Sequence, residues 1–200
     1  SWGLNNQGQI GNNTTSVAVG NTSKMQITGG TITSSNASAV YNSGGEMSIS
    51  GNTSIEHYGD SGVTVSNTGI MDITGGSIVS ESSNAINNKG TMSIVGYPTI
   101  QSPLKPTIAN RETGILTISQ LNLDAGTTNA ILNYGQLEIN EETTIINNAS
   151  NLPTIYNYEG SSIVVNAGTI TNNGGGYAVY RKSTDISITI SPNANVSKYN

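Results

Sequence analysis

A short repeat runs through the whole chain and restricts its possible folds more than any other feature. The segment Val17–Met25 reads VAVGNTSKM and the segment Val63–Met71 reads VTVSNTGIM. Each repeat contains two apolar residues spaced by two positions, which is the periodicity of side chains on one face of a strand. These pairs are Trp2/Leu4, Met25/Ile27, Met47/Ile49, Met71/Ile73, Met92/Ile94, Leu116/Ile118, Leu137/Ile139, Ile163/Val165 and Ile188/Ile190. A chain with so short a period is expected to fold as a stack of similar units.

Two further apolar rows and one asparagine row recur with the same period as these pairs. The second row is Ile10, Ile32, Ile55, Ile78, Ile100, Leu123, Ile145, Ile170 and Val196. The third row is Val19, Val40, Val65, Ile86, Ile108, Ile131, Ile155 and Val179. An asparagine follows the third row two positions later, at Asn21, Asn42, Asn67, Asn88, Asn110, Asn133 and Asn157, with Arg181 next in line. The mean spacing of these asparagines is about 22.7 residues, which is enough for three short strands and three turns.

The repeat predicts an all-β coil stack, a parallel β-helix of about nine coils of roughly 22–23 residues with three strands per coil. One coil cannot bury its few aliphatic side chains, whereas stacked coils bury them against each other and pair each strand with its counterpart. Stacked asparagine amides can bond from coil to coil because each carries donors and an acceptor. Residues 1–200 are expected to form a single domain. The end coils show no capping segment, so the chain is expected to be part of a longer protein.

The distance between the first and second rows alternates between six and five residues, from Leu4–Ile10 to Val165–Ile170. The coils therefore come in pairs of about 45 residues. This alternation indicates growth by duplication of a two-coil unit.

The aliphatic rows and the asparagine row resemble those of the pectate-lyase-like superfamily of right-handed parallel β-helices. The run MxIxGGxIxSxxxxAIxN at Met71–Asn88 is similar to repeats in surface proteins of Gram-positive and gut bacteria. The resemblance covers essentially the whole chain and implies a right-handed helix. It leaves function open, because the same architecture occurs in lyases, hydrolases, phage tailspikes and adhesins.

Composition excludes several classes of function. The net charge is −5 and only seven Lys and Arg residues are present, which argues against nucleic acid as a partner. No apolar run approaches the ~20 residues of a membrane-spanning helix. The chain has no cysteine, so it can form neither disulfides nor thiolate metal sites.

The residues that could carry catalysis or bind a metal do not form a recognisable pattern. The four aspartates, Asp60, Asp72, Asp124 and Asp185, fall on different coils. Glu138, Glu141 and Glu142 could bind a cation, but an exposed acidic corner is the simpler interpretation. His57, the single histidine, is expected in a surface turn beside Glu56 and Tyr58. We therefore predict no catalytic residues, no metal and no cofactor.

An aromatic cluster is predicted on the outer surface near the C-terminal coils. The residues that flank the asparagine row should point outward there, and in coils six to eight they include four tyrosines. The candidate ligand-binding residues are Tyr134, Tyr156, Tyr158, Tyr180, Arg181 and Lys182. Three interpretations stay open: cross-strand packing that stabilises the sheet, contact with another protein, and stacking on a glycan.

These observations favour a non-enzymatic segment of an extracellular bacterial protein, either a rigid stalk or an adhesin region that binds polysaccharide or host glycan. One alternative is a fragment of a polysaccharide-degrading enzyme or a phage tailspike. A second is a fibre subunit that associates end to end or laterally through unpaired strand edges.

Overall fold

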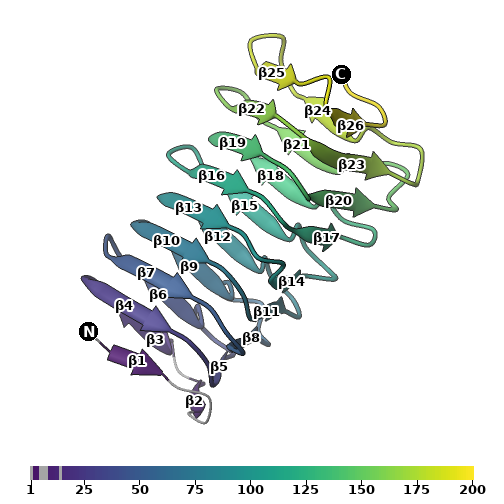
Figure 1. The fold of residues 1–200 in the computed structure, drawn as a ribbon. Coiled ribbons are helices and arrows are strands. Elements are labelled where there is room, and N and C mark those ends of the chain that lie inside the picture. Colours follow the sequence, from purple (N-terminus) through teal and green to yellow (C-terminus); the bar gives the residue numbers. More distant parts are fainter. Residues whose placement is uncertain (1, 5–8, 14) are drawn as a thin grey trace.

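The computed structural model describes residues 2–4, 9–13 and 15–200 of the chain. This part contains 26 short strands and no helix, and every strand pairing within it is parallel. The strands stack coil upon coil from the N-terminal to the C-terminal end (Figure 1). The described residues therefore contain no helix long and apolar enough to cross a membrane.

The first face of the stack is a nine-stranded sheet, which we call sheet A. Its strands are β1 (Trp2–Leu4), β4 (Lys24–Ile27), β7 (Glu46–Ile49), β10 (Ile70–Ile73), β13 (Thr91–Ile94), β16 (Ile115–Ile118), β19 (Gln136–Ile139), β22 (Ser162–Val165) and β25 (Ser187–Ile190). The predicted apolar pairs are in register: Met71 pairs with Met47 on one side and with Met92 on the other.

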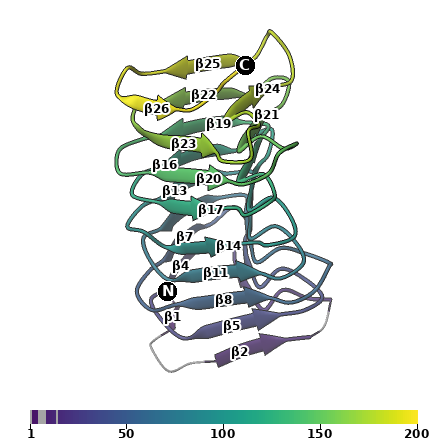
Figure 2. The same cartoon turned by 90° about the vertical axis from the view of Figure 1, so that its right-hand side faces the viewer.

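The second face consists of two sheets that follow each other along the stack, and Figure 2 shows them one above the other. Sheet B contains β2 (Gln9–Asn12), β5 (Thr31–Ser34), β8 (Ser54–His57), β11 (Ser77–Ser80) and β14 (Thr99–Gln101). Sheet D contains β17 (Asn122–Asp124), β20 (Thr144–Asn147), β23 (Gly168–Asn172) and β26 (Ala194–Val196). The division falls beside β14, which Pro98 and Pro103 flank closely. Neither proline has an N–H group to donate to a neighbouring strand, so the pairing of this face cannot extend through residues 98 and 103.

The third face is an eight-stranded sheet, sheet C. Its strands are β3 (Val19–Asn21), β6 (Val40–Asn42), β9 (Val65–Asn67), β12 (Ile86–Asn88), β15 (Ile108–Asn110), β18 (Ile131–Asn133), β21 (Ile155–Asn157) and β24 (Val179–Arg181). After β26 only an isolated bridge, between Tyr199 and Val179, continues this face. The stack thus has about eight turns, so the predicted count of nine coils is slightly too high, while three strands per coil is confirmed.

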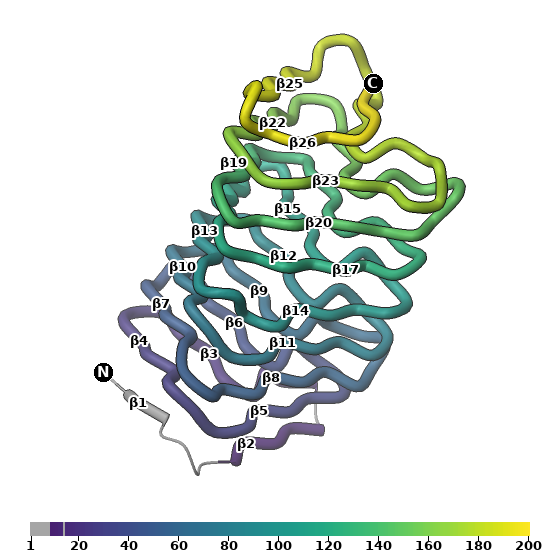
Figure 3. Tube along the Cα trace, turned by 45° about the vertical axis from the view of Figure 1, so that its right-hand side comes forward, coloured from purple at the N-terminus to yellow at the C-terminus, as the bar shows by residue number. Residues whose placement is uncertain are grey.

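The core is the closed interior of the stack, which the three faces surround (Figure 3). From Ile27 to Val179 the aliphatic rows are almost entirely buried and form one continuous hydrophobic cluster. At the C-terminal end Ile188, Ile190 and Val196 are only partly buried against that cluster. Stacking of identical positions thus gives short apolar strands the burial that no single coil could provide.

The predicted asparagine row forms a hydrogen-bonded ladder at the end of the sheet C strands. Its members, which we call the asparagine ladder, are Asn21, Asn42, Asn67, Asn88, Asn110, Asn133 and Asn157. Each Nδ2 donates to the Oδ1 of the next asparagine over 2.8–2.9 Å. The ladder ends where Arg181 replaces asparagine, and Asn157 donates instead to the Tyr180 carbonyl at 3.4 Å. The ladder is therefore a continuous line of buried polar contacts across seven coils.

The position of His57 corrects the sequence-based prediction. The residue is completely buried at the end of β8, where it pairs in register with Ser34 and Ser80. The strand extends two residues beyond Ile55, and alternation turns Glu56 outward and His57 inward. The last two residues of β8 are polar, so a prediction based on the apolar rows alone assigns them to a turn.

Candidate functional site

The four predicted tyrosines come together on the outer surface of sheet C. Tyr156 and Tyr180 occupy outward positions of β21 and β24 and are paired in register, with Leu132 of β18 as the neighbour of Tyr156. Tyr134 and Tyr158 follow directly after β18 and β21. Parallel pairing places equivalent side chains about 4.8 Å apart, so aromatic residues at one register position necessarily meet.

The rings form one continuous series of contacts. Tyr134 and Tyr158 are stacked, with ring centroids 3.9 Å apart and an angle of 12° between the planes. Tyr156 is tilted against Tyr158 at 4.5 Å and against Tyr180 at 5.2 Å. Tyr180 in turn contacts Tyr177 at 5.5 Å. We call these five residues the tyrosine ladder.

The two ends of the tyrosine ladder differ in how the rings pack and in the space beside them. At the Tyr134 end two ring faces cover each other, and such aromatic pairs contribute about 0.5–1.5 kcal/mol beyond simple burial. At the other end the rings of Tyr156, Tyr177 and Tyr180 are tilted and border a hollow of about 400 Å³. The first end therefore fits the packing interpretation, and the second end offers space for a ligand.

Three cations lie over the rings of the tyrosine ladder. Arg111 is 5.5 Å from the Tyr134 centroid, Lys182 is 5.6 Å from that of Tyr158, and Lys198 is 4.5 Å from that of Tyr177. The part of the chain that the structure describes has a single ion pair, Lys24–Glu46 at 3.2 Å, so no carboxylate neutralises these three cations. Their charge is therefore available to an anionic ligand.

Arg181 does not join the tyrosine ladder. It occupies the register position of Asn157 and lines a separate hollow together with Ile188, Ile190 and Tyr199. Conversely, sequence reasoning missed Tyr177 and Lys198. Tyr177 lies in the turn before β24 and Lys198 follows β26, so neither belongs to the repeated positions from which the cluster was predicted.

The hollow beside the tyrosine ladder is bordered by two loops. Its lining comprises Ser150, Asn151, Leu152, Pro153, Tyr156, Gly175, Gly176, Tyr177, Tyr180 and Lys198. Leu152 is largely exposed although it is aliphatic. The site thus combines aromatic rings, an aliphatic side chain and one ammonium group, a combination suited to a ligand with both apolar faces and negative charge.

The interior of the tyrosine ladder disfavours ionised tyrosine. Burial, followed by the hydrogen bond with Tyr134 and the charge of its phenolate form, raises the pKa of Tyr158 to about 12, although Lys182 and Arg111 act in the opposite direction. Burial also raises the pKa of Tyr156, with Tyr158 and Tyr180 contributing. The hydroxyl groups of Tyr156 and Tyr158 therefore remain hydrogen-bond donors at any physiological pH.

The tyrosine ladder is expected to weaken at alkaline pH. Tyr158 favours its neutral form in the folded state, so its contribution is complete below the ordinary pKa of about 10 and is lost as pH rises from 10 to about 12. We expect Tyr158→Phe to reduce the alkaline fall in melting temperature by a few degrees. Thermal denaturation between pH 9 and pH 12 measures this, with Tyr199→Phe, an exposed tyrosine outside the ladder, as the control. Identical pH profiles for wild type and Tyr158→Phe would contradict the assignment.

No metal-binding constellation accompanies the tyrosine ladder. Within residues 2–4, 9–13 and 15–200, no group of three or more His, Asp or Glu side chains is placed to hold a metal ion. The glutamates expected at an acidic corner, Glu138, Glu141 and Glu142, are indeed exposed.

Comparisons of the chain with protein-family models, with curated proteins and with solved structures give no match. The fold and the site define the class of protein: a parallel β-solenoid with three strands per coil, an internal asparagine ladder and an external tyrosine ladder.

Proposed function

We propose that the chain is a non-enzymatic, rigid segment of an extracellular bacterial protein that binds an acidic polysaccharide through the open end of the tyrosine ladder. The observation that carries this proposal is the hollow where the tilted rings of Tyr156, Tyr177 and Tyr180 meet the ammonium group of Lys198. Sugar rings present apolar C–H faces that pack on aromatic rings, while carboxylate groups pair with cations. The extracellular, bacterial setting is supported by the resemblance at Met71–Asn88.

Local charge supports an acidic ligand despite the net charge of −5. At physiological ionic strength the Debye length is about 8 Å, so acidic groups elsewhere on the stack are largely screened. Lys198 lies over the Tyr177 ring at the hollow, and Lys182 and Arg111 lie within 6 Å of the Tyr158 and Tyr134 rings further along the ladder. Three of the seven basic residues of the chain thus surround one surface.

The double substitution Tyr156→Ala/Tyr180→Ala is expected to weaken binding of acidic polysaccharide by at least about tenfold, because it removes two of the three rings that border the hollow. Affinity electrophoresis and calorimetry with polygalacturonate, alginate, hyaluronate and heparin would measure this. Tyr41→Ala is the matched control, since Tyr41 occupies the same outward register position of sheet C but has Gly20 and Ser66 as neighbours.

Two of the alternatives, sheet stabilisation and an enzyme fragment, predict different outcomes. If the tyrosine ladder only stabilises the sheet, the double variant lowers the melting temperature and no polysaccharide binds even to wild type. If the chain is part of a degrading enzyme, reducing ends or unsaturated products accumulate during the same incubations. Binding by wild type without product formation, lost in the double variant and retained in Tyr41→Ala, supports the proposal.

A further inference from the structure

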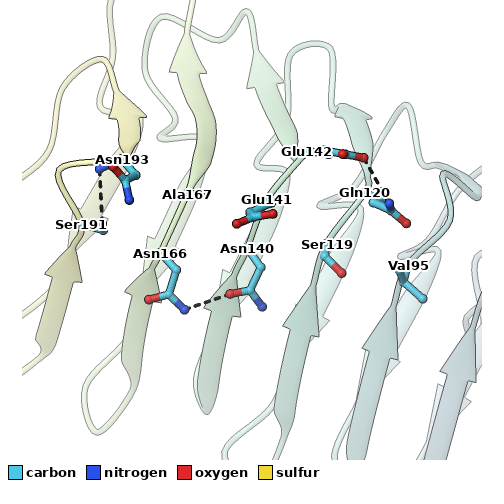
Figure 4. A pocket seen from close by; sticks show the side chains of 10 residues that line it. All are labelled: Val95, Ser119, Gln120, Asn140, Glu141, Glu142, Asn166, Ala167, Ser191 and Asn193. Carbon is cyan, nitrogen blue, oxygen red and sulfur yellow. Dashed lines mark hydrogen bonds between the residues drawn. The ribbon is translucent and has the colours of Figure 1, made fainter.

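A second hollow lies at another corner of the stack, after the sheet A strands. It has a volume of about 870 Å³ and we call it the corner groove. Its floor takes one residue from each of five successive coils, each directly after a sheet A strand: Val95, Ser119, Asn140, Asn166 and Ser191. Gln120, Glu141, Glu142, Ala167 and Asn193 complete the lining (Figure 4). Five coils at about 4.8 Å make the groove roughly 19 Å long, which is the length of a chain molecule rather than a single sugar.

The floor of the corner groove holds oriented amides with free hydrogen-bonding groups. Asn166 Nδ2 donates to Asn140 Oδ1 and to Glu138 Oε1, each at 2.9 Å. Figure 4 shows these two asparagines side by side on neighbouring strands. Among the described residues, Asn140 Nδ2, Asn166 Oδ1 and the Glu141 carboxylate have no hydrogen-bond partner. One donor and two kinds of acceptor are thus held next to each other and remain available.

The backbone at the upper rim of the corner groove has positive φ angles at residues other than glycine. The only non-glycine residues with positive φ in the described chain are Tyr97 at 58°, Gln120 at 51° and Glu142 at 55°. They occupy this corner in three successive coils, whereas other coils place Gly76 and Gly168 there with φ of 86° and 96°. Side chains in this conformation are strained, and glycine would avoid that cost. At these three positions the chain therefore carries a side chain at a backbone conformation that glycine would adopt more easily.

The three residues are joined to one another by hydrogen bonds. Tyr97 Oη donates to Glu142 Oε2 at 3.0 Å, and Gln120 Nε2 donates to the same oxygen at 3.1 Å. The Tyr97 N–H also donates to the Gln120 carbonyl at 2.7 Å. The strained residues thus hold the Glu142 carboxylate in place at the rim, with the half-exposed Tyr97 ring next to it.

The charge of the lining argues against an anionic ligand. The lining contains two carboxylates and no Lys or Arg, and Glu138 lies next to it, so an anionic chain would be repelled. A hydroxyl group both donates and accepts hydrogen bonds and is matched by neighbouring amide and carboxylate groups. We propose that the corner groove binds a neutral, hydroxyl-rich oligosaccharide that lies parallel to the stack axis. This site is separate from the tyrosine ladder: Tyr134 precedes β19 and Asn140 follows it, so the two sites flank sheet A.

The test is an NMR titration of isotope-labelled protein with linear neutral oligosaccharides of cellulose, xylan, mannan and chitin type, in the presence of a chelator. At least one of them is expected to shift the side-chain amide signals of Asn140 and Asn166 saturably at millimolar concentration. Asn140→Ala/Asn166→Ala, followed through the backbone amide signals of the groove lining, is expected to weaken this binding at least about tenfold, and Glu141→Gln to weaken it while preserving side-chain volume. Asn52→Ala is the matched control, an exposed asparagine at the same corner outside the groove.

The Tyr156→Ala/Tyr180→Ala variant separates the two proposals, because it should leave corner-groove binding unchanged. If the whole panel leaves the Asn140 and Asn166 signals unmoved, the proposal is wrong. It is equally wrong if binding survives both Asn140→Ala/Asn166→Ala and Glu141→Gln. Neither result bears on binding of acidic polysaccharide at the tyrosine ladder.

Discussion

Replacing Asn110 by alanine is expected to lower the free energy of unfolding by about 3–5 kcal/mol. Asn110 is completely buried in the middle of the asparagine ladder. Its Oδ1 accepts from Asn88 Nδ2 at 2.9 Å, and its Nδ2 donates to Asn133 Oδ1 at 2.9 Å and to the Gln136 carbonyl at 2.8 Å. Alanine would leave the Asn133 amide oxygen and one Asn88 N–H buried without partners, each at a cost of about 1–3 kcal/mol.

Chemical denaturation followed by circular dichroism would measure this loss as a fall in the transition midpoint. Asn122→Ala is the control, because Asn122 lies on an exposed position of β17 and should change stability by less than about 0.5 kcal/mol. A midpoint for Asn110→Ala close to that of Asn122→Ala would mean that the asparagine ladder does not stabilise the stack.

The stack is expected to lose stability in mild acid because of His57. Burial lowers the pKa of His57, and the carbonyl groups of Ser61, Gly59 and Ser34 only partly oppose this effect. Neither ring nitrogen has a hydrogen-bond partner of normal geometry among the described residues. The neutral ring is therefore favoured in the folded state. Its stabilising contribution is complete above the unfolded pKa of about 6.5 and is lost as pH falls from there toward the lower folded pKa.

Within this window the free energy of unfolding should fall by up to about 1.4 kcal/mol per pH unit, the limit for uptake of one proton. His57→Asn is the informative variant, because the same column of sheet B carries Asn12 two coils earlier. Urea denaturation at several pH values from 8 down to 5 should show a slope for wild type and a flatter profile for His57→Asn. Parallel profiles would show that His57 does not control acid stability.

Much of the fold could be predicted because side-chain alternation and coil period together determine the register. A slip of one residue would turn the aliphatic rows outward, so Met71 could pair only with Met47 and Met92. The asparagine ladder followed from the same register. The count of about eight turns, the division of the second face beside β14 and the burial of His57 did not follow, because each depends on where a strand ends rather than on which face it buries.

The candidate sites were predictable only in part. The tyrosines at repeated positions were placed correctly, because stacking brings equivalent residues together. Tyr177 and Lys198 lie outside the strands, so the repeat could not assign them. Arg181 continues the asparagine row, as the repeat indicated, and for that reason does not join the outward tyrosines. The orientation of the ring faces, which decides where a sugar could bind, also required the tertiary structure.

The sequence by itself determined the coil stack, its core rows and the asparagine ladder, because these depend on periodicities of two residues and of one coil. Only the tertiary structure decided the conformations and contacts of the residues at the corners of the stack. Turn residues there adopt individual conformations that no period encodes, and side chains 45 residues apart, such as Tyr97 and Glu142, meet across coils. The corner groove depends on these contacts between turn residues of different coils, whereas the core depends on the repeat.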